Sequence, residues 1–289
     1  MSVTLDKKYG LYLVVLLAAT GFFLYQQFPA QTLEDYAASR IHRIMPGVEV
    51  KLGKAGMILP PGIKLVDVEM FRSGNLLFHA DKLKLRPELL SFFGDTRTVN
   101  FRGTVAQGTA EGSLASSSQM RLSVETDLKG IRLEDIPAVY DLARREIKGR
   151  LTGQITFQSR NGNLFQGTGK AGLHLLDGTV QLLFPILNMD SLDFRTIDAD
   201  ITLQTGGRIR IADCRFNGNQ MEGSVAGTLM LAQPLEKSRL DLKGTVKPYP
   251  VLAANIRKMF PVNSLFGKQS GGIPFRIEGT LGSPQLALR

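Results

Sequence analysis

The sequence predicts a mainly β protein: an N-terminal transmembrane helix followed by a curved, mostly antiparallel β-sheet with two or three short helices. Three observations support this prediction. A long uncharged stretch lies near the N-terminus, apolar and polar residues alternate along most of the chain after it, and the 289 residues include 30 Gly. Alternation with a period of two is typical of strands with one buried face, and frequent Gly suits tight turns and bends.

The N-terminal stretch has the properties of a membrane anchor. Residues 9–33 carry no charge, and their most apolar part reads GLYLVVLLAATGFFLYQQF. A helix needs about 20 such residues to cross the hydrocarbon core. Because Lys7 and Lys8 precede the stretch, the positive-inside rule places the N-terminus in the cytoplasm. We therefore expect a cytoplasmic segment at 1–8 and a transmembrane helix at 9–28.

A cleaved signal peptide is the alternative for this segment, since its short basic start fits that class as well. The apolar stretch is long for a signal peptide, however, and the FPAQ step that follows lacks a small-x-small cleavage pattern. These two features favour an uncleaved anchor. Residues 29–47 are then expected to lead into the folded domain, largely as a helix over 32–45 that Pro46 and Gly47 end.

Residues 48–289 are expected to form one β-rich domain on the far side of the membrane. Turn sequences separate its strands, namely Arg-Asn-Gly-Asn at 160–163, Thr-Gly-Gly at 205–207 and Asn-Gly-Asn at 217–219, and these favour antiparallel hairpins. The alternating pattern predicts strands at 48–52, 62–71, 81–87, 120–128, 154–158, 197–205, 207–212 and 238–246.

Two segments within this domain show helical spacing instead. The first is 135–148, with Asp135 as its N-cap and Gly149 just after its end. The second is shorter, at 251–259, and Pro261 follows it.

A loose internal similarity accompanies the strands. Gly-x-x-x-Gly occurs at 108–112, 149–153 and 223–227, each time beside alternating residues. In a membrane helix this spacing would suggest dimerisation, but the context here is a strand. We interpret these glycines as points where strands curve or bulge.

The charge distribution argues against nucleic-acid binding. The formal net charge is +9, yet the basic residues are spread along the chain without a dense cluster or an interleaved aromatic platform. This spread is more typical of a solvated surface, including one near anionic lipid headgroups. We therefore expect no nucleic-acid partner.

The sequence contains no motif for catalysis, metal binding or a cofactor. The histidines, His42, His79 and His174, are far apart, and Cys214 has no partner for a disulfide, so we expect Cys214 to be a small, partly buried side chain. Nucleophile elbows, phosphate-binding loops and dinucleotide fingerprints are missing. We expect no enzyme activity, no metal and no cofactor.

Acidic residues give one weak exception to that conclusion. Asp198 and Asp200 alternate on one strand face, where two carboxylates can in principle serve acid–base chemistry. Without a supporting motif, we interpret them as solubilising residues.

Alternation also predicts which aliphatic side chains share a face. In three strands, a pair of aliphatic residues on the inner face flanks one outward-facing residue, which is Lys84, Thr202 or Asp241. If the sheet curls without a second sheet to cover it, the inner residues line an apolar groove. The alternative is that the helical segments or a second sheet fill this space. The candidate groove-lining residues are Leu83 with Leu85, Ile201 with Leu203, and Leu240 with Leu242.

Several stretches together resemble the type II secretion system protein N family. Each stretch alone is a pattern of Gly, Pro and alternating aliphatics, so their order and spacing carry the resemblance. They are ILPPGIKLVDVEMF (58–71), ADKLKLRPELLSFFG (80–94), VNFRGTVAQGTAEGSL (99–114), IRLEDIPAVYDLARREIKGRLTGQITF (131–157) and IPFRIEGTLGSPQLAL (273–288).

The same features are similar to the wider AsmA-like group, whose strands curl into a long open trough. The resemblance implies a Gram-negative host, a single-pass inner-membrane anchor and a periplasmic domain. It also implies a non-enzymatic accessory part in type II secretion, through contacts with other inner-membrane components of that system. The alternative is an AsmA-like protein that holds or transfers lipid acyl chains in an apolar β groove.

Overall fold

The computed structural model describes residues 48–58, 62–117, 119, 121–160, 163–186, 189–259 and 272–288. The cytoplasmic segment, transmembrane helix and linker helix predicted for residues 1–47 lie outside this part of the chain. Within it, no helix has both the length and the apolar character needed to cross a membrane.

The described residues form one antiparallel sheet of 14 strands, in which every strand pairs with its neighbour in the sequence. The fold is therefore mainly β, as predicted. The strands are β1 (Val48–Ile58), β2 (Gly62–Arg72), β3 (Asn75–Pro87), β4 (Thr96–Val105), β5 (Gly108–Ser117), β6 (Arg121–Arg132), β7 (Ile147–Arg160), β8 (Thr168–Ile186), β9 (Met189–Gln204), β10 (Arg208–Gly218), β11 (Met221–Met230), β12 (Arg239–Pro248), β13 (Ile273–Thr280) and β14 (Ser283–Leu288).

The segments predicted from alternation fall on β1, β2, β3, β6, β7, β9, β10 and β12. The predicted Thr-Gly-Gly turn connects β9 to β10, and Gly206 and Gly207 adopt φ values of 87° and 73°. Glycine reaches this left-handed region without steric cost, which explains why the hairpin needs it there.

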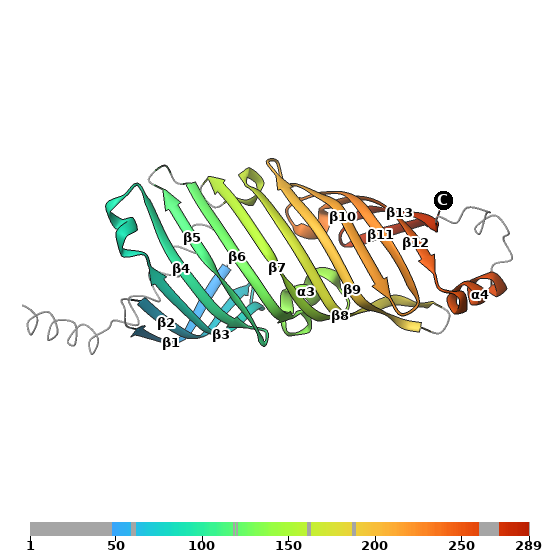
Figure 1. The fold of residues 1–289 in the computed structure, drawn as a ribbon, viewed down its shortest axis with the longest axis horizontal. Coiled ribbons are helices and arrows are strands. Elements are labelled where there is room, and N and C mark those ends of the chain that lie inside the picture. The colour runs from blue at the N-terminus through green and yellow to red at the C-terminus, as the bar shows by residue number, and fades with distance from the viewer. Residues whose placement is uncertain are drawn as a thin grey trace, which may run out of the picture.

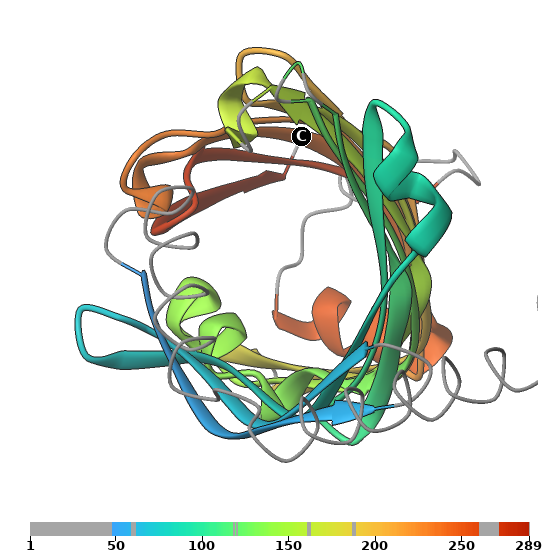
Figure 2. The same ribbon diagram turned by 90° about the vertical axis from the view of Figure 1, so that its left-hand side faces the viewer.

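The sheet follows the long axis of the molecule and curls around it (Figure 1, Figure 2). Seen along that axis, β1–β3 and β13 lie across from each other, and the helix α3 (Pro137–Ala143) lies on the inner side of the curl. The shape is an open trough of strands and not a flat sheet.

Helix α3 corrects the helix predicted at 135–148. Pro137 occupies the first helical position, Ile136 is the N-cap residue, and Asp135 belongs to a preceding 3₁₀ turn, η2 (Leu133–Asp135), so it is not the cap. The helix ends where Arg144 adopts a left-handed conformation at φ 54°. After irregular residues at 144–146, the last two residues of the predicted helix, Ile147 and Lys148, belong to β7 because they pair with β8.

The second predicted helix is confirmed as α4 (Pro250–Met259), which begins one residue earlier than expected. Its first residue is again a proline, whose fixed φ suits the first turn of a helix. Three further 3₁₀ turns complete the described elements: η1 (Leu89–Phe93), η3 (Leu164–Gln166) and η4 (Leu235–Lys237).

The main buried cluster lies on β2, β3, β4 and β6. Its buried members are Leu65, Val68, Ala80, Val105 and Ile131. Ile136, which leads into α3, packs against this cluster. Because α3 lies inside the curl, the apolar face of the sheet is the concave one.

Each predicted Gly-x-x-x-Gly segment contains a point of very close strand approach. A Cβ atom at Gly112 would overlap the carbonyl group of Glu125, and one at Gly153 would overlap the carbonyl oxygen of Gly172. At Gly227, which has φ 153°, it would overlap the Asp241 carbonyl oxygen. These glycines therefore let neighbouring strands come close at points where a side chain would not fit.

Candidate binding surface on the concave face

All six predicted groove-lining residues lie on the apolar face of the sheet. Paired residues of adjacent antiparallel strands point to the same face, so the register can be followed from strand to strand. One row of pairs starts at Met57 in β1, passes through Leu85, Ile201 and Leu242, and reaches Leu286 in β14.

Two more rows flank this central row. The row on one side contains Leu83 and continues to Phe275 in β13. The row on the other side runs from Val99 through Leu203 and Leu240. None of the three rows contains a charged residue. The register therefore brings all six side chains onto one face of the sheet.

The concave face is well buried at one end of the sheet and only partly buried farther along it. Leu83 and Leu85 pack against the buried cluster beneath η2 and α3. In contrast, Ile201, Leu203, Leu240 and Leu242 are only partly buried and belong to no described core cluster. The expected filling by a helix therefore applies near β2–β7, and no second sheet covers the face within the described residues.

Three adjacent apolar rows make a long, narrow surface. With strands about 4.8 Å apart, 14 strands extend the rows over roughly 60 Å, and residues two apart in a strand separate neighbouring rows by about 7 Å. Exposed apolar surfaces of this kind are uncommon on soluble domains, which makes the partly exposed stretch of the rows a candidate for binding a partner or ligand.

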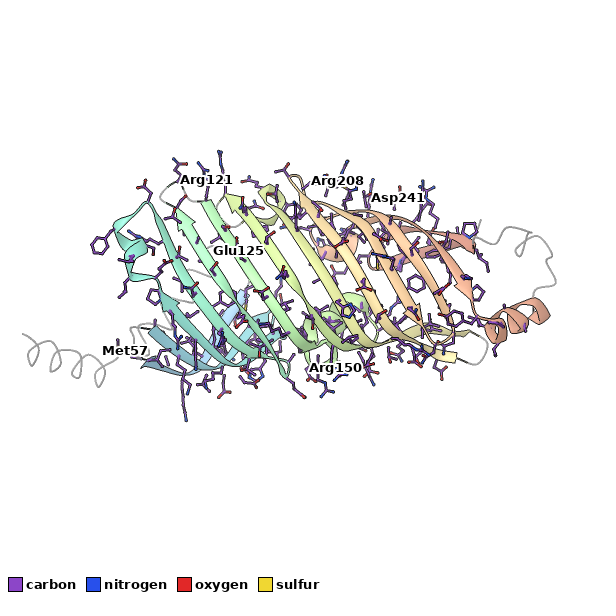
Figure 3. The ribbon with its side chains drawn as sticks, in the orientation of Figure 1. Met57, Arg121, Glu125, Arg150, Arg208 and Asp241 are labelled. Atoms are coloured by element: carbon purple, nitrogen blue, oxygen red, sulfur yellow. The ribbon has the colours of Figure 1, made fainter. Side chains whose placement is uncertain are left out.

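The opposite, convex face and the rims of the sheet are polar. Figure 3 shows Arg121 and Arg208 at one rim, Arg150 at the other, and Glu125 on β6 between them. On the convex face, the Asp241 carboxylate accepts hydrogen bonds of 3.0 and 2.9 Å from the Arg276 guanidinium. The apolar rows are therefore isolated on the concave face.

A depression of about 850 Å³ lies at the end of β7–β10. Phe157 and Leu203 contribute to its lining, but Thr156, Lys170 and Thr202 of the convex face line it as well. Its mixed lining makes it a poor site for a fully apolar ligand.

The two histidines that the structure describes form polar pairs on the surface. His174 Nδ1 pairs with an Asp198 carboxylate oxygen, and His79 Nε2 lies 3.9 Å from an Asp67 oxygen. His42 lies outside the described residues. No three His, Cys, Asp or Glu side chains of the described part come together as metal ligands. Asp198 thus has a cross-strand partner, in keeping with its interpretation as a surface residue.

Cys214 belongs to the apolar row of Leu83, which the sequence alone did not indicate. It pairs with Ala199 and Val225 and is partly buried, as expected. Burial raises the pKa of the Cys214 thiol, and the carboxylates of Asp213 and Asp198 add to this effect. A thiol with a raised pKa is a weak nucleophile at neutral pH.

Comparison with known proteins gives no relative for this chain: no family model matches it, and neither the curated proteins nor the solved structures contain a match.

Proposed function

We propose that this protein is a non-enzymatic accessory component of the type II secretion system. Its N-terminal segment holds it in the inner membrane, and its periplasmic domain acts through contacts with other inner-membrane components. The supporting observation is the open curled sheet with an apolar concave face, which is the architecture that the family resemblance implies. The five resembling stretches follow one another along this sheet, from the end of β1 to β14.

The concave face supports a role in binding rather than in chemistry. Its three rows offer aliphatic and aromatic contact surface but no charged group. Apolar side chains such as Ile201, Leu203 and Leu242 remain partly exposed there. Covering them with a segment of a partner protein removes apolar surface from water, at about 25 cal/mol per Å².

Site-specific photo-crosslinking in the native host tests this function. Benzoylphenylalanine replaces Leu242 on the concave face or its neighbour Lys243 on the convex face. We expect the Leu242 probe to capture an inner-membrane secretion component and the Lys243 probe not to capture it. Deleting the gene should also reduce export of secreted proteins into the medium. Normal export together with no captured secretion component would contradict the proposal.

A second function, holding lipid acyl chains, is favoured by the length and uniformity of the apolar rows. The rows extend roughly 60 Å, whereas one leaflet of a bilayer has a hydrocarbon depth of about 15 Å. Each buried CH₂ group of a chain contributes about 0.8 kcal/mol, so a groove only part of this length provides substantial affinity. Mass spectrometry of lipid extracted from the purified protein tests this candidate.

A further inference from the structure

The fold gathers basic side chains from four strands onto one part of the convex face. Lys64, Lys84 and Arg102 pair directly across β2, β3 and β4. These three residues and their basic neighbours, here named the basic face, are Lys54, Lys64, Lys82, Lys84, Arg86 and Arg102.

Like charges at directly opposite positions of a sheet are unfavourable. The positive charge of Arg102 is balanced by an ion pair with Glu111, at 2.7 Å between Nη2 and Oε2. Within the described residues, Lys64, Lys84 and Arg86 form no ion pair. The repulsion among these facing cations therefore lowers the stability of the isolated domain, and binding of an anionic partner would remove the repulsion.

The basic face ends sharply at β5. Lys84, Arg86 and Arg102 line one side of a depression of about 410 Å³, and Glu111, Glu125 and Asp127 of β5 and β6 line the other side. The basic face thus borders acidic residues of β5 and β6 and itself lies on β1–β4. These are the first strands after the predicted anchor.

We propose that the basic face binds anionic lipid headgroups of the membrane that anchors the chain. This inference rests on the predicted anchor at 9–28, and it does not depend on the secretion role or on an acyl ligand. The connection at 29–47 spans roughly 30 Å if it is helical, so β1 begins within reach of the bilayer surface. Basic side chains close to a membrane are attracted by the negative potential of anionic lipids.

This contact orients the trough. With β1–β4 on the headgroups through their convex side, the concave rows face away from the bilayer surface at that end of the sheet. The chemistry favours a lipid surface over a single-stranded nucleic acid, because no stacking aromatic side chain lies among the residues of the basic face.

The test uses the full-length protein in nanodiscs of phosphatidylcholine, alone or with phosphatidylglycerol. A fluorophore is attached at Asn100→Cys, beside Arg86 and Arg102, in a Cys214→Ser background, and headgroup spin-labelled lipid serves as quencher. We expect quenching several-fold stronger in anionic discs than in neutral discs. Raised salt should remove most of the difference, because surface electrostatics are screened within about 10 Å at 0.1 M.

Two matched triple variants distinguish an effect of the basic face from an effect of the protein's total charge. Lys64→Gln, Lys84→Gln and Arg86→Gln together should abolish the difference between anionic and neutral discs. The control variant removes the same net charge from other strands of the sheet and should keep the difference between the two kinds of disc. It combines Arg208→Gln, Arg210→Gln and Arg239→Gln. Equal quenching in both kinds of disc, or equal loss in both variants, would overturn the proposal.

Stability gives an independent readout in detergent without lipid. Lys84→Gln relieves the facing cations and should raise the Tm by about 1–3 °C. A fall in Tm would show that the cations do not oppose one another, and it would remove the argument for an anionic partner.

Discussion

Leu203 in β9 pairs with Ile209 in β10 across the Thr-Gly-Gly turn, and both side chains lie on the concave face while remaining partly exposed to solvent. Thr202, which precedes Leu203 in the sequence, pairs with Arg210 on the convex face. Adjacent positions of one strand therefore report on the two faces separately. This arrangement supplies matched controls for most tests of the trough.

Cys214 provides a native probe of the apolar rows. We expect a maleimide to label it slowly near neutral pH and faster as the pH rises, because its raised pKa keeps the thiol protonated. A bound fatty acid should slow labelling at every pH. Ser224→Cys in a Cys214→Ser background is the control, since Ser224 pairs with Arg215 on the convex face and its labelling should not respond to fatty acid. Equal responses at both positions would contradict the assignment of the faces.

Gly153 tests the claim that close strand approach shapes the curl. Gly153→Ala places a Cβ against the Gly172 carbonyl oxygen and should destabilise the fold by about 1–3 kcal/mol. Gly172→Ala is the control on the adjacent strand, where the new Cβ meets only the Asp200 carboxylate at 3.8 Å. Chemical denaturation measures both. A similar cost for the two variants would argue against the backbone contact.

Glu134 fixes η2 to the start of β7. Its carboxylate accepts a 3.1 Å hydrogen bond from the Gly149 N–H and pairs with Arg132 at 2.8 Å. Partial burial tends to raise the pKa of Glu134, but backbone N–H groups and the Arg132 guanidinium outweigh it and hold the pKa below its usual value. The stabilisation is therefore present at neutral pH and is lost as the pH falls through the lowered pKa.

Glu134→Ala should accordingly cost about 1–3 kcal/mol at pH 7, and the difference from wild type should shrink below the usual glutamate pKa of about 4.3. Glu146→Ala is the control, because the half-exposed Glu146 only pairs with Lys148 at 3.1 Å. We expect it to cost less than about 0.5 kcal/mol. A pH-independent loss for Glu134→Ala would show that the carboxylate charge is not involved.

Membrane topology is tested by reporter fusions at Arg289. The predicted anchor and the preceding Lys7 and Lys8 place this end in the periplasm. A reporter that works only in the periplasm should be active there, and one that works only in the cytoplasm should be silent. The reverse pattern would contradict the predicted orientation of the anchor and the periplasmic location of the domain.

The apolar face was predictable from sequence, but the full extent of the sheet was less so. Strict alternation identified Leu83, Leu203 and Leu242, because a period of two fixes the face of every side chain in a strand. Strands β4, β5, β8, β11, β13 and β14 lay outside the predicted alternating segments, although the Gly-x-x-x-Gly stretches in β5 and β11 were interpreted as parts of strands. Glycine, alanine and serine weaken the alternation where strands approach closely. Gly112 in β5 is an example.

Other features depended on three-dimensional context. The spacing of Ile147 fits a helix that starts at Asp135, but pairing with Val180 draws it into β7. This competition between local spacing and sheet formation is invisible in a single sequence. The basic face was hidden for a related reason, since Lys64 and Arg102 are distant along the chain and meet only through the register of β2–β4.

The central claim is that the concave face is an open binding surface and not a filled core, and Leu203→Asp tests it most directly. In an open trough the new carboxylate reaches water, so circular dichroism and Tm should stay close to those of wild type. Lipid that co-purifies with the residue 30–289 domain, prepared without detergent, should be lost from Leu203→Asp but retained by the convex control Thr202→Asp, as measured by mass spectrometry. A filled core would instead bury an unpaired charge and unfold the domain. An unfolded Leu203→Asp variant, together with a wild-type protein free of lipid, would contradict the account.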